Sequence, residues 1–216
     1  MKNTERLVGK IIECFEIYVK KGLFNEDFIG PDKKYYSGRR CHSRVLGILI
    51  KAFQSEGYIT DVERSIRFKE RYKPPERKRA MHQYRPDITI VNENDEIVGI
   101  VEYETIDAEE EHLFRKIDYF DHAIPGNPTL QFIMFFPTLT TLDRAPQKWI
   151  ETDRKKYSKP ILERLKKLSE KHSRIDVIYM ILDENGISYK IIKDGDIQKE
   201  KDNINIWKSK DSDEKS

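Results

Sequence analysis

The stretch that decides the fold is RPDITIVNENDEIVGIVEYE, residues 85–104. Two apolar segments, ITIV and IVGIV, flank the polar turn NENDE, and this pattern predicts a β-hairpin. Asp87 precedes the first segment, while Glu102 and Glu104 stand on either side of Tyr103 after the second. A turn centred between Asn94 and Asp95 sets Asp87 opposite Glu102. The hairpin therefore predicts a buried strand pair with carboxylates at its open end.

Directly opposed residues of a hairpin share a face, with Cβ atoms roughly 5 Å apart, and a residue two positions along projects from that face as well. Asp87, Glu102 and Glu104 should therefore meet at one end of the sheet. Three close carboxylates repel one another unless they are protonated or share a cation. Mg²⁺ and Mn²⁺ prefer such oxygen ligands. The alternative interpretation is that the three groups simply point into solvent.

Here the residues resemble a known family. Pro86-Asp87, followed by Glu102-Tyr103-Glu104, is similar to the motif of the PD-(D/E)XK nuclease superfamily, and the predicted order of helices and strands over about 43–136 agrees with its core. The resemblance implies a three-layer α/β/α fold, as in restriction endonucleases and archaeal Holliday-junction resolvases. The central sheet would be mixed, and this chain would add N-terminal and C-terminal helices.

Carried over position by position, the resemblance implies that Asp87 and Glu102 bind Mg²⁺ or Mn²⁺ and that the main-chain carbonyl of Tyr103 is a further ligand. Glu104 stands where the family usually has Lys. Some type II restriction enzymes also have Glu at this motif position, so Glu104 does not by itself imply inactivity. It could act as general base on the attacking water or as another metal ligand. Alternatively, the missing cation comes from Arg115 or Lys116 on the following helix, or the site has decayed.

The remaining chain fits one domain over 1–195, with its core in 43–136 and 144–193 and a polar, disordered tail over 196–216. Apolar spacing predicts helices over 4–21, 43–57, 107–123 and 144–172. Strands are predicted over 58–68 and 129–136, and as a closing hairpin over 175–192. Pro74 and Pro75 exclude a strand interior over 69–82, which is therefore predicted to be an excursion from the fold.

Charge is balanced over the whole chain, with 40 Lys and Arg against 38 Asp and Glu, so nucleic-acid binding must depend on local clusters. Residues 67–85 hold eight basic residues against two Glu and should overhang the carboxylates. The phosphate contacts predicted there are Arg71, Lys73, Arg77, Lys78, Arg79 and Arg85. A second basic run over 33–40 includes two tyrosines, which suits unstacked nucleic acid. Both stretches equally fit solvated loops.

These patterns favour a Mg²⁺- or Mn²⁺-dependent endonuclease that hydrolyses DNA, including branched DNA. Asp87 and Glu102 would hold the ion, with Glu104 assisting. Two alternatives stay open: a non-catalytic nucleic-acid-binding protein on the same fold, and an assembly or scaffold protein. No apolar run reaches membrane-spanning length, so a cytoplasmic protein without a membrane partner is expected. The resemblance also implies a homodimer.

Overall fold

The computed structural model describes residues 2–21, 39–62, 64–73, 81–103, 110–123, 130–137, 147–173, 175–183 and 186–206. The described residues form a mixed α/β protein. The helices are α1 (Lys2–Lys20), α3 (Arg39–Ser55), α4 (Glu110–Ala123) and α5 (Gln147–Lys171). The strands are β1 (Ile59–Val62), β2 (Ile66–Tyr72), β3 (Met81–Tyr84), β4 (Ile88–Val91), β5 (Ile97–Tyr103), β6 (Leu130–Pro137), β7 (Ile175–Asp183), β8 (Gly186–Lys193) and β9 (Asp196–Ile204).

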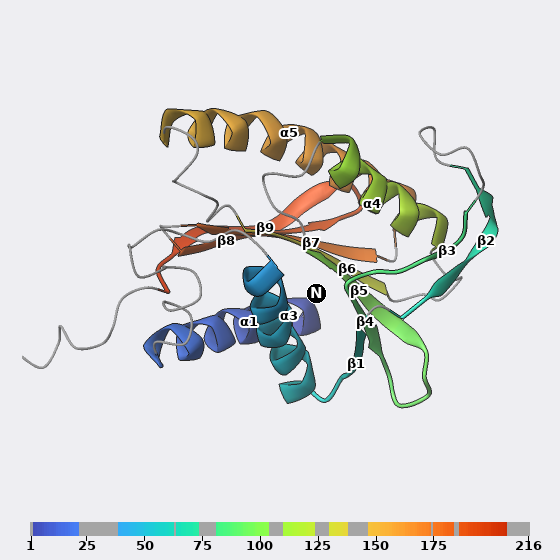
Figure 1. Ribbon diagram of the computed structural model, residues 1–216, viewed down its shortest axis with the longest axis horizontal. Helices are drawn as coiled ribbons and strands as arrows, with labels where there is room; N and C mark the ends of the chain where they lie inside the picture. Colours follow the sequence, from blue (N-terminus) through green and yellow to red (C-terminus); the bar gives the residue numbers. More distant parts are fainter. Residues whose placement is uncertain are drawn as a thin grey trace, which may run out of the picture.

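Seven strands pair side by side in the order β1-β4-β5-β6-β7-β8-β9 (Figure 1). The β5–β6 and β6–β7 pairs are parallel, and the other pairs are antiparallel. The two parallel pairs are connected through α4 and α5, as parallel neighbours require a long crossover. Strands β2 and β3 form a separate two-stranded sheet, which lies beside α4.

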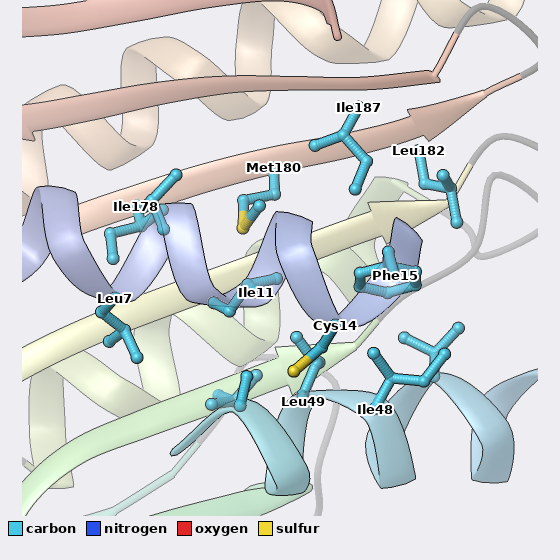
Figure 2. Packing of buried hydrophobic residues seen from close by; sticks show 14 of the residues in the cluster. Leu7, Ile11, Cys14, Phe15, Ile48, Leu49, Ile178, Met180, Leu182 and Ile187 are labelled. Carbon is cyan, nitrogen blue, oxygen red and sulfur yellow. The ribbon is translucent and has the colours of Figure 1, made fainter. Parts of the chain in front are cut away.

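Helices cover both faces of the seven-stranded sheet: α1 and α3 lie on one face, α4 and α5 on the other (Figure 1). Strand β7 contributes to both cores because its side chains alternate between the faces. Figure 2 shows Ile178 and Met180 of β7 with Ile11 and Phe15 of α1 in the first core. The second core contains Ile117 and Phe120 of α4, Ile161 and Leu165 of α5, and Val177 and Tyr179 of β7.

Two partly buried aspartates, Asp176 and Asp121, form hydrogen bonds that connect helices to other elements of the fold. Asp176 on β7 accepts hydrogen bonds from Thr4 Oγ1 at 2.6 Å and from Lys193 Nζ at 3.1 Å. On the other face, Asp121 of α4 bonds Lys171 Nζ at 2.7 Å and also bonds His172. Burial raises the pKa of Asp121, but the hydrogen bonds with Lys171 and His172 outweigh it and hold this pKa below its ordinary value of 3.8.

Two boundaries predicted from the sequence are wrong. The second helix begins at Arg39 rather than near Ser43. The single strand predicted over 58–68 is two strands in different sheets, because β1 ends at Val62 and β2 begins at Ile66. The excursion predicted over 69–82 therefore contains ordered strand at both ends. The two prolines exclude a strand only after Tyr72, where β2 has already ended.

The disordered tail predicted over 196–216 is also corrected, as far as Ile206. Strand β9 pairs with β8, and the Ile206 side chain is buried. Asp194 and Gly195 have φ angles of 51° and 82°, which suit the two-residue hairpin turn that Asp-Gly favours. Strand β9 is polar because it is an edge strand whose ladder is made by backbone groups. Residues 207–216 lie outside the described residues.

The remaining predicted elements are confirmed to within a few residues, including α1, α5, β6 and the β7–β8 hairpin. None of the helices in the described ranges is both long and apolar enough to cross a membrane.

Candidate active site

The β4–β5 hairpin has the predicted register. Thr89 pairs with Ile100, and the next steps outward set Asp87 beside Glu102 at the end of the ladder. The Tyr103 N–H donates a hydrogen bond of 2.8 Å to Asp87 Oδ2 and so holds the two chain ends together. The register shift in this pair lies near the turn, at the opposite end from the carboxylates. The sequence pattern therefore places both predicted metal ligands correctly relative to each other.

The two carboxylates differ in their access to water. Glu102 is fully buried, with a relative exposure of 0%, whereas the Asp87 side chain retains 19%. Glu102 is buried because it lies within β5, close to the second core beneath α4. A buried carboxylate is strongly unfavourable unless charged or hydrogen-bonding groups compensate its lost hydration.

Lys116 of α4 provides that compensation. Its Nζ lies 2.6 Å from Glu102 Oε2, 3.0 Å from Asp87 Oδ2 and 3.1 Å from the main-chain oxygen of Tyr103. These are the three groups predicted as metal ligands. The buried side chains of Ile117 and Phe120 fix the rotation of α4 about its axis and thereby turn Lys116 toward the sheet.

Tyr84 completes the surroundings of Glu102, and sequence reasoning missed it. The buried Tyr84 hydroxyl donates a hydrogen bond to Glu102 Oε1, so each carboxylate oxygen of Glu102 has a different partner. The Tyr84 ring packs edge to face on Tyr119 of α4, with centroids 5.9 Å apart. The one feature of the sequence that could have indicated this role of Tyr84 is its position, since it is an aromatic residue with a hydroxyl group two residues before Pro86. Its contact depends on the path of β3, which periodicity did not predict.

A cavity of about 330 Å³ opens beside this cluster, between β3 and α4. Tyr84 and Lys116 belong both to its wall and to the surroundings of Glu102. Among the described residues, its lining contains three basic side chains and no acidic one: Met81, Gln83, Tyr84, Arg85, Arg115, Lys116 and Tyr119. The cavity thus brings an anion-favouring surface next to the acidic pair.

The other predicted site residues are placed as follows. Of the two candidates for the displaced cation, Lys116 reaches the carboxylates and Arg115 lines the cavity. Arg85 also lines the cavity and donates from Nε to Ser65 Oγ at 3.0 Å. Lys73 is exposed just after β2. Outside the described residues lie Glu104, Arg77, Lys78, Arg79 and the side chain of Arg71.

The donor set suits a hard divalent cation: two carboxylates and a carbonyl oxygen lie around one position, now taken by the Lys116 ammonium. Mg²⁺ commonly binds proteins through one or two carboxylates and keeps several waters. Within the described ranges, however, no group of three or more His, Cys, Asp or Glu side chains is placed to hold a metal ion. Only two of the three predicted carboxylates are among those ranges.

Comparison with known proteins adds no assignment: no protein-family model, curated protein or solved structure matches this chain.

Proposed function

We propose that this protein is a Mg²⁺- or Mn²⁺-dependent endonuclease that hydrolyses phosphodiester bonds of DNA on a three-layer, restriction endonuclease-like core. The observation that supports this best is the convergence of Asp87, Glu102 and the Tyr103 carbonyl on one cationic group. The nuclease motif needs two acidic ligands, a carbonyl and a lysine. This chain has Glu104 at the lysine position, and Lys116 brings an ammonium to the same carboxylates from α4.

Bound at these oxygens, the metal would polarise the phosphodiester and lower the pKa of an attacking water. The chain's own groups supply the remaining requirements. Tyr84 and the Tyr103 N–H orient the two carboxylates. Lys116 lines the cavity, so its ammonium can stabilise negative charge that develops on a phosphate there. Arg85 and Arg115 would position the strand through its phosphates. Glu104 remains the proposed general base.

The test is cleavage of supercoiled plasmid, duplex, single-stranded, flap and four-way-junction DNA, each with Mg²⁺, Mn²⁺ or EDTA. Asp87→Asn should abolish metal-dependent cutting. Asp176→Asn is the matched control, because Asp176 is a similarly buried carboxylate bonded to a lysine, but it belongs to the opposite face of the sheet. Cutting that survives Asp87→Asn, or is lost equally in both variants, contradicts the proposed site.

A second candidate is a non-catalytic nucleic-acid-binding protein. It is favoured by one observation: Lys116 already compensates both carboxylates, so the folded site does not require a metal. This candidate predicts that oligonucleotide binding, measured by fluorescence anisotropy, weakens steeply with salt but persists in EDTA and in Asp87→Asn. Metal-dependent cutting by the unsubstituted protein would eliminate it.

A further inference from the structure

We infer that Lys116 is the resident counter-ion of the acidic pair, and that it leaves the three oxygens whenever they hold a divalent cation. The lysine and the metal would thus exchange at one position. This inference rests on the proposed metal site and deepens it, because it states what the site contains before metal arrives and how strongly the chain itself opposes metal binding.

The distances make the two cations mutually exclusive. A single nitrogen lies within 3.1 Å of Glu102 Oε2, Asp87 Oδ2 and the Tyr103 oxygen, and it therefore fills the space that these oxygens share. Two positive charges confined to that space would repel each other strongly in a partly desolvated site. Lys116 must therefore move before the same three oxygens can hold a divalent cation.

Burial makes the process an exchange rather than a simple loss of the lysine. The Glu102 side chain is 1% exposed, and a buried carboxylate without a cation is strongly destabilising. Some cation must therefore remain beside Glu102 in every state in which it is ionised. Lys116 is the cation beside Glu102 when no metal is bound.

The site is built so that the lysine can leave without disturbing the oxygens. Tyr84 holds Glu102 through Oε1, whereas Lys116 contacts Oε2. The Tyr103 N–H holds Asp87 independently of the lysine. Lys116 itself lines the cavity and has a flexible four-carbon stem, so its ammonium can turn into that space. The ligand geometry is thus preorganised by groups other than the cation.

Isothermal titration of the full chain with Mn²⁺ tests the exchange, using Lys116→Met and, as the matched control, Lys193→Met. Lys193 also pairs with a partly buried carboxylate, but it belongs to the other face of the sheet. Lys116→Met should bind Mn²⁺ at least about tenfold more tightly than the unsubstituted chain, because the loss of one charged hydrogen bond already corresponds to roughly that factor. Lys193→Met should bind like the unsubstituted chain, and Asp87→Asn should bind far more weakly.

A second measurement needs no substitution and so does not depend on the folding of a variant. Lysines of the unsubstituted protein are acetylated briefly with and without Mn²⁺, and the modified positions are quantified by mass spectrometry. Lys116 is 17% exposed and held by three oxygens, so its modification should rise severalfold with Mn²⁺, whereas that of Lys193 should stay constant.

The outcomes separate this inference from the proposed function. Equal Mn²⁺ affinity in the unsubstituted chain and Lys116→Met, with binding lost in Asp87→Asn, overturns the exchange and leaves the metal site standing. Unchanged acetylation of Lys116 in Mn²⁺ also overturns the exchange. If neither protein binds Mn²⁺, or Asp87→Asn binds as well as the others, both the exchange and the metal site are wrong.

Discussion

Lys116→Met offers the sharpest test of how the buried carboxylate is stabilised. Methionine keeps most of the length and the apolar character of the lysine stem, and it removes the ammonium. In metal-free solution the substitution leaves the buried Glu102 carboxylate without the Lys116 ammonium. The matched control is Lys193→Met, whose partner Asp176 is also partly buried. Each variant removes one lysine, but Lys116 pairs with the two carboxylates Glu102 and Asp87, whereas Lys193 pairs with Asp176. The two variants therefore differ in the number and in the burial of the carboxylates that lose a cation.

The expected loss of unfolding free energy in each variant follows from the solvent exposure of the lysine and of its carboxylate partners. Removal of one partner from a buried ion pair typically costs about 3–5 kcal/mol. The Lys116 side chain retains 17% exposure, and Asp87 retains 19%, so we expect a value near the lower end, about 3 kcal/mol. The Lys193 side chain is 35% exposed, and such a pair contributes only about 0–1 kcal/mol. The two variants should therefore differ by about 2 kcal/mol or more.

The assay is urea unfolding at pH 7 in EDTA, with the free energy of unfolding compared across both single variants and the double variant Lys116→Met/Glu102→Gln. Neutralising Glu102 should restore much of the lost stability, which gives a favourable coupling between the two substitutions. Equal losses in Lys116→Met and Lys193→Met would refute the reasoning. So would a double variant whose loss equals the sum of the single losses, because Lys116 would then act through packing alone.

Three further predictions use guanidinium unfolding. Gly186→Ala should destabilise the protein by at least about 1–3 kcal/mol, because Gly186 has φ of 125° and an added Cβ would overlap the main-chain carbonyl of Ile204 at the end of β9. Gly9→Ala, with open space around it in α1, should be neutral or stabilising. Tyr84→Phe should cost about 1–3 kcal/mol by removing a hydrogen bond to buried Glu102, whereas Tyr179→Phe should cost nothing, because its buried hydroxyl has no hydrogen-bond partner among the described residues. Asp121→Asn should weaken the dependence of the unfolding free energy on pH between about pH 7 and 2. The pKa of Asp121 in the folded protein lies below its ordinary value of 3.8, so the ionised carboxylate stabilises the fold at pH values above 3.8, and this contribution is lost as the pH falls through the folded-state pKa. An unchanged pH dependence in Asp121→Asn contradicts the prediction.

The part of the candidate site that lies on the β4–β5 hairpin, Asp87 and Glu102, could be predicted from the sequence. Two apolar runs about a polar turn set the hairpin register, and the register alone brings Asp87 beside Glu102. Strand alternation has a period of two, so a one-residue error would have put the carboxylates on opposite faces. The apolar periodicity of α1, α4 and α5 predicted those helices for the same reason: short-range spacing determines which side chains share a face.

The polar strand β9 shows where periodicity stops being informative. Its residues are mostly exposed, and it is ordered through its backbone ladder with β8, which carries no hydrophobic signal. The Asp194-Gly195 turn was the one local clue to that hairpin. The sequence also did not predict that residues 58–68 are divided between two sheets, because an alternating strand pattern does not indicate which strand will be the hydrogen-bonding neighbour.

The sequence by itself determined the hairpin, the pairing of its two carboxylates and the absence of a lysine at the motif position. Only the tertiary structure decided between Arg115 and Lys116, and only it brought Tyr84 to the second oxygen of Glu102. The choice depends on the rotation of α4 about its axis, which is set by packing of Ile117 and Phe120 against the sheet. Adjacent helical residues point about 100° apart, so that packing selects which of two neighbouring cations faces the carboxylates.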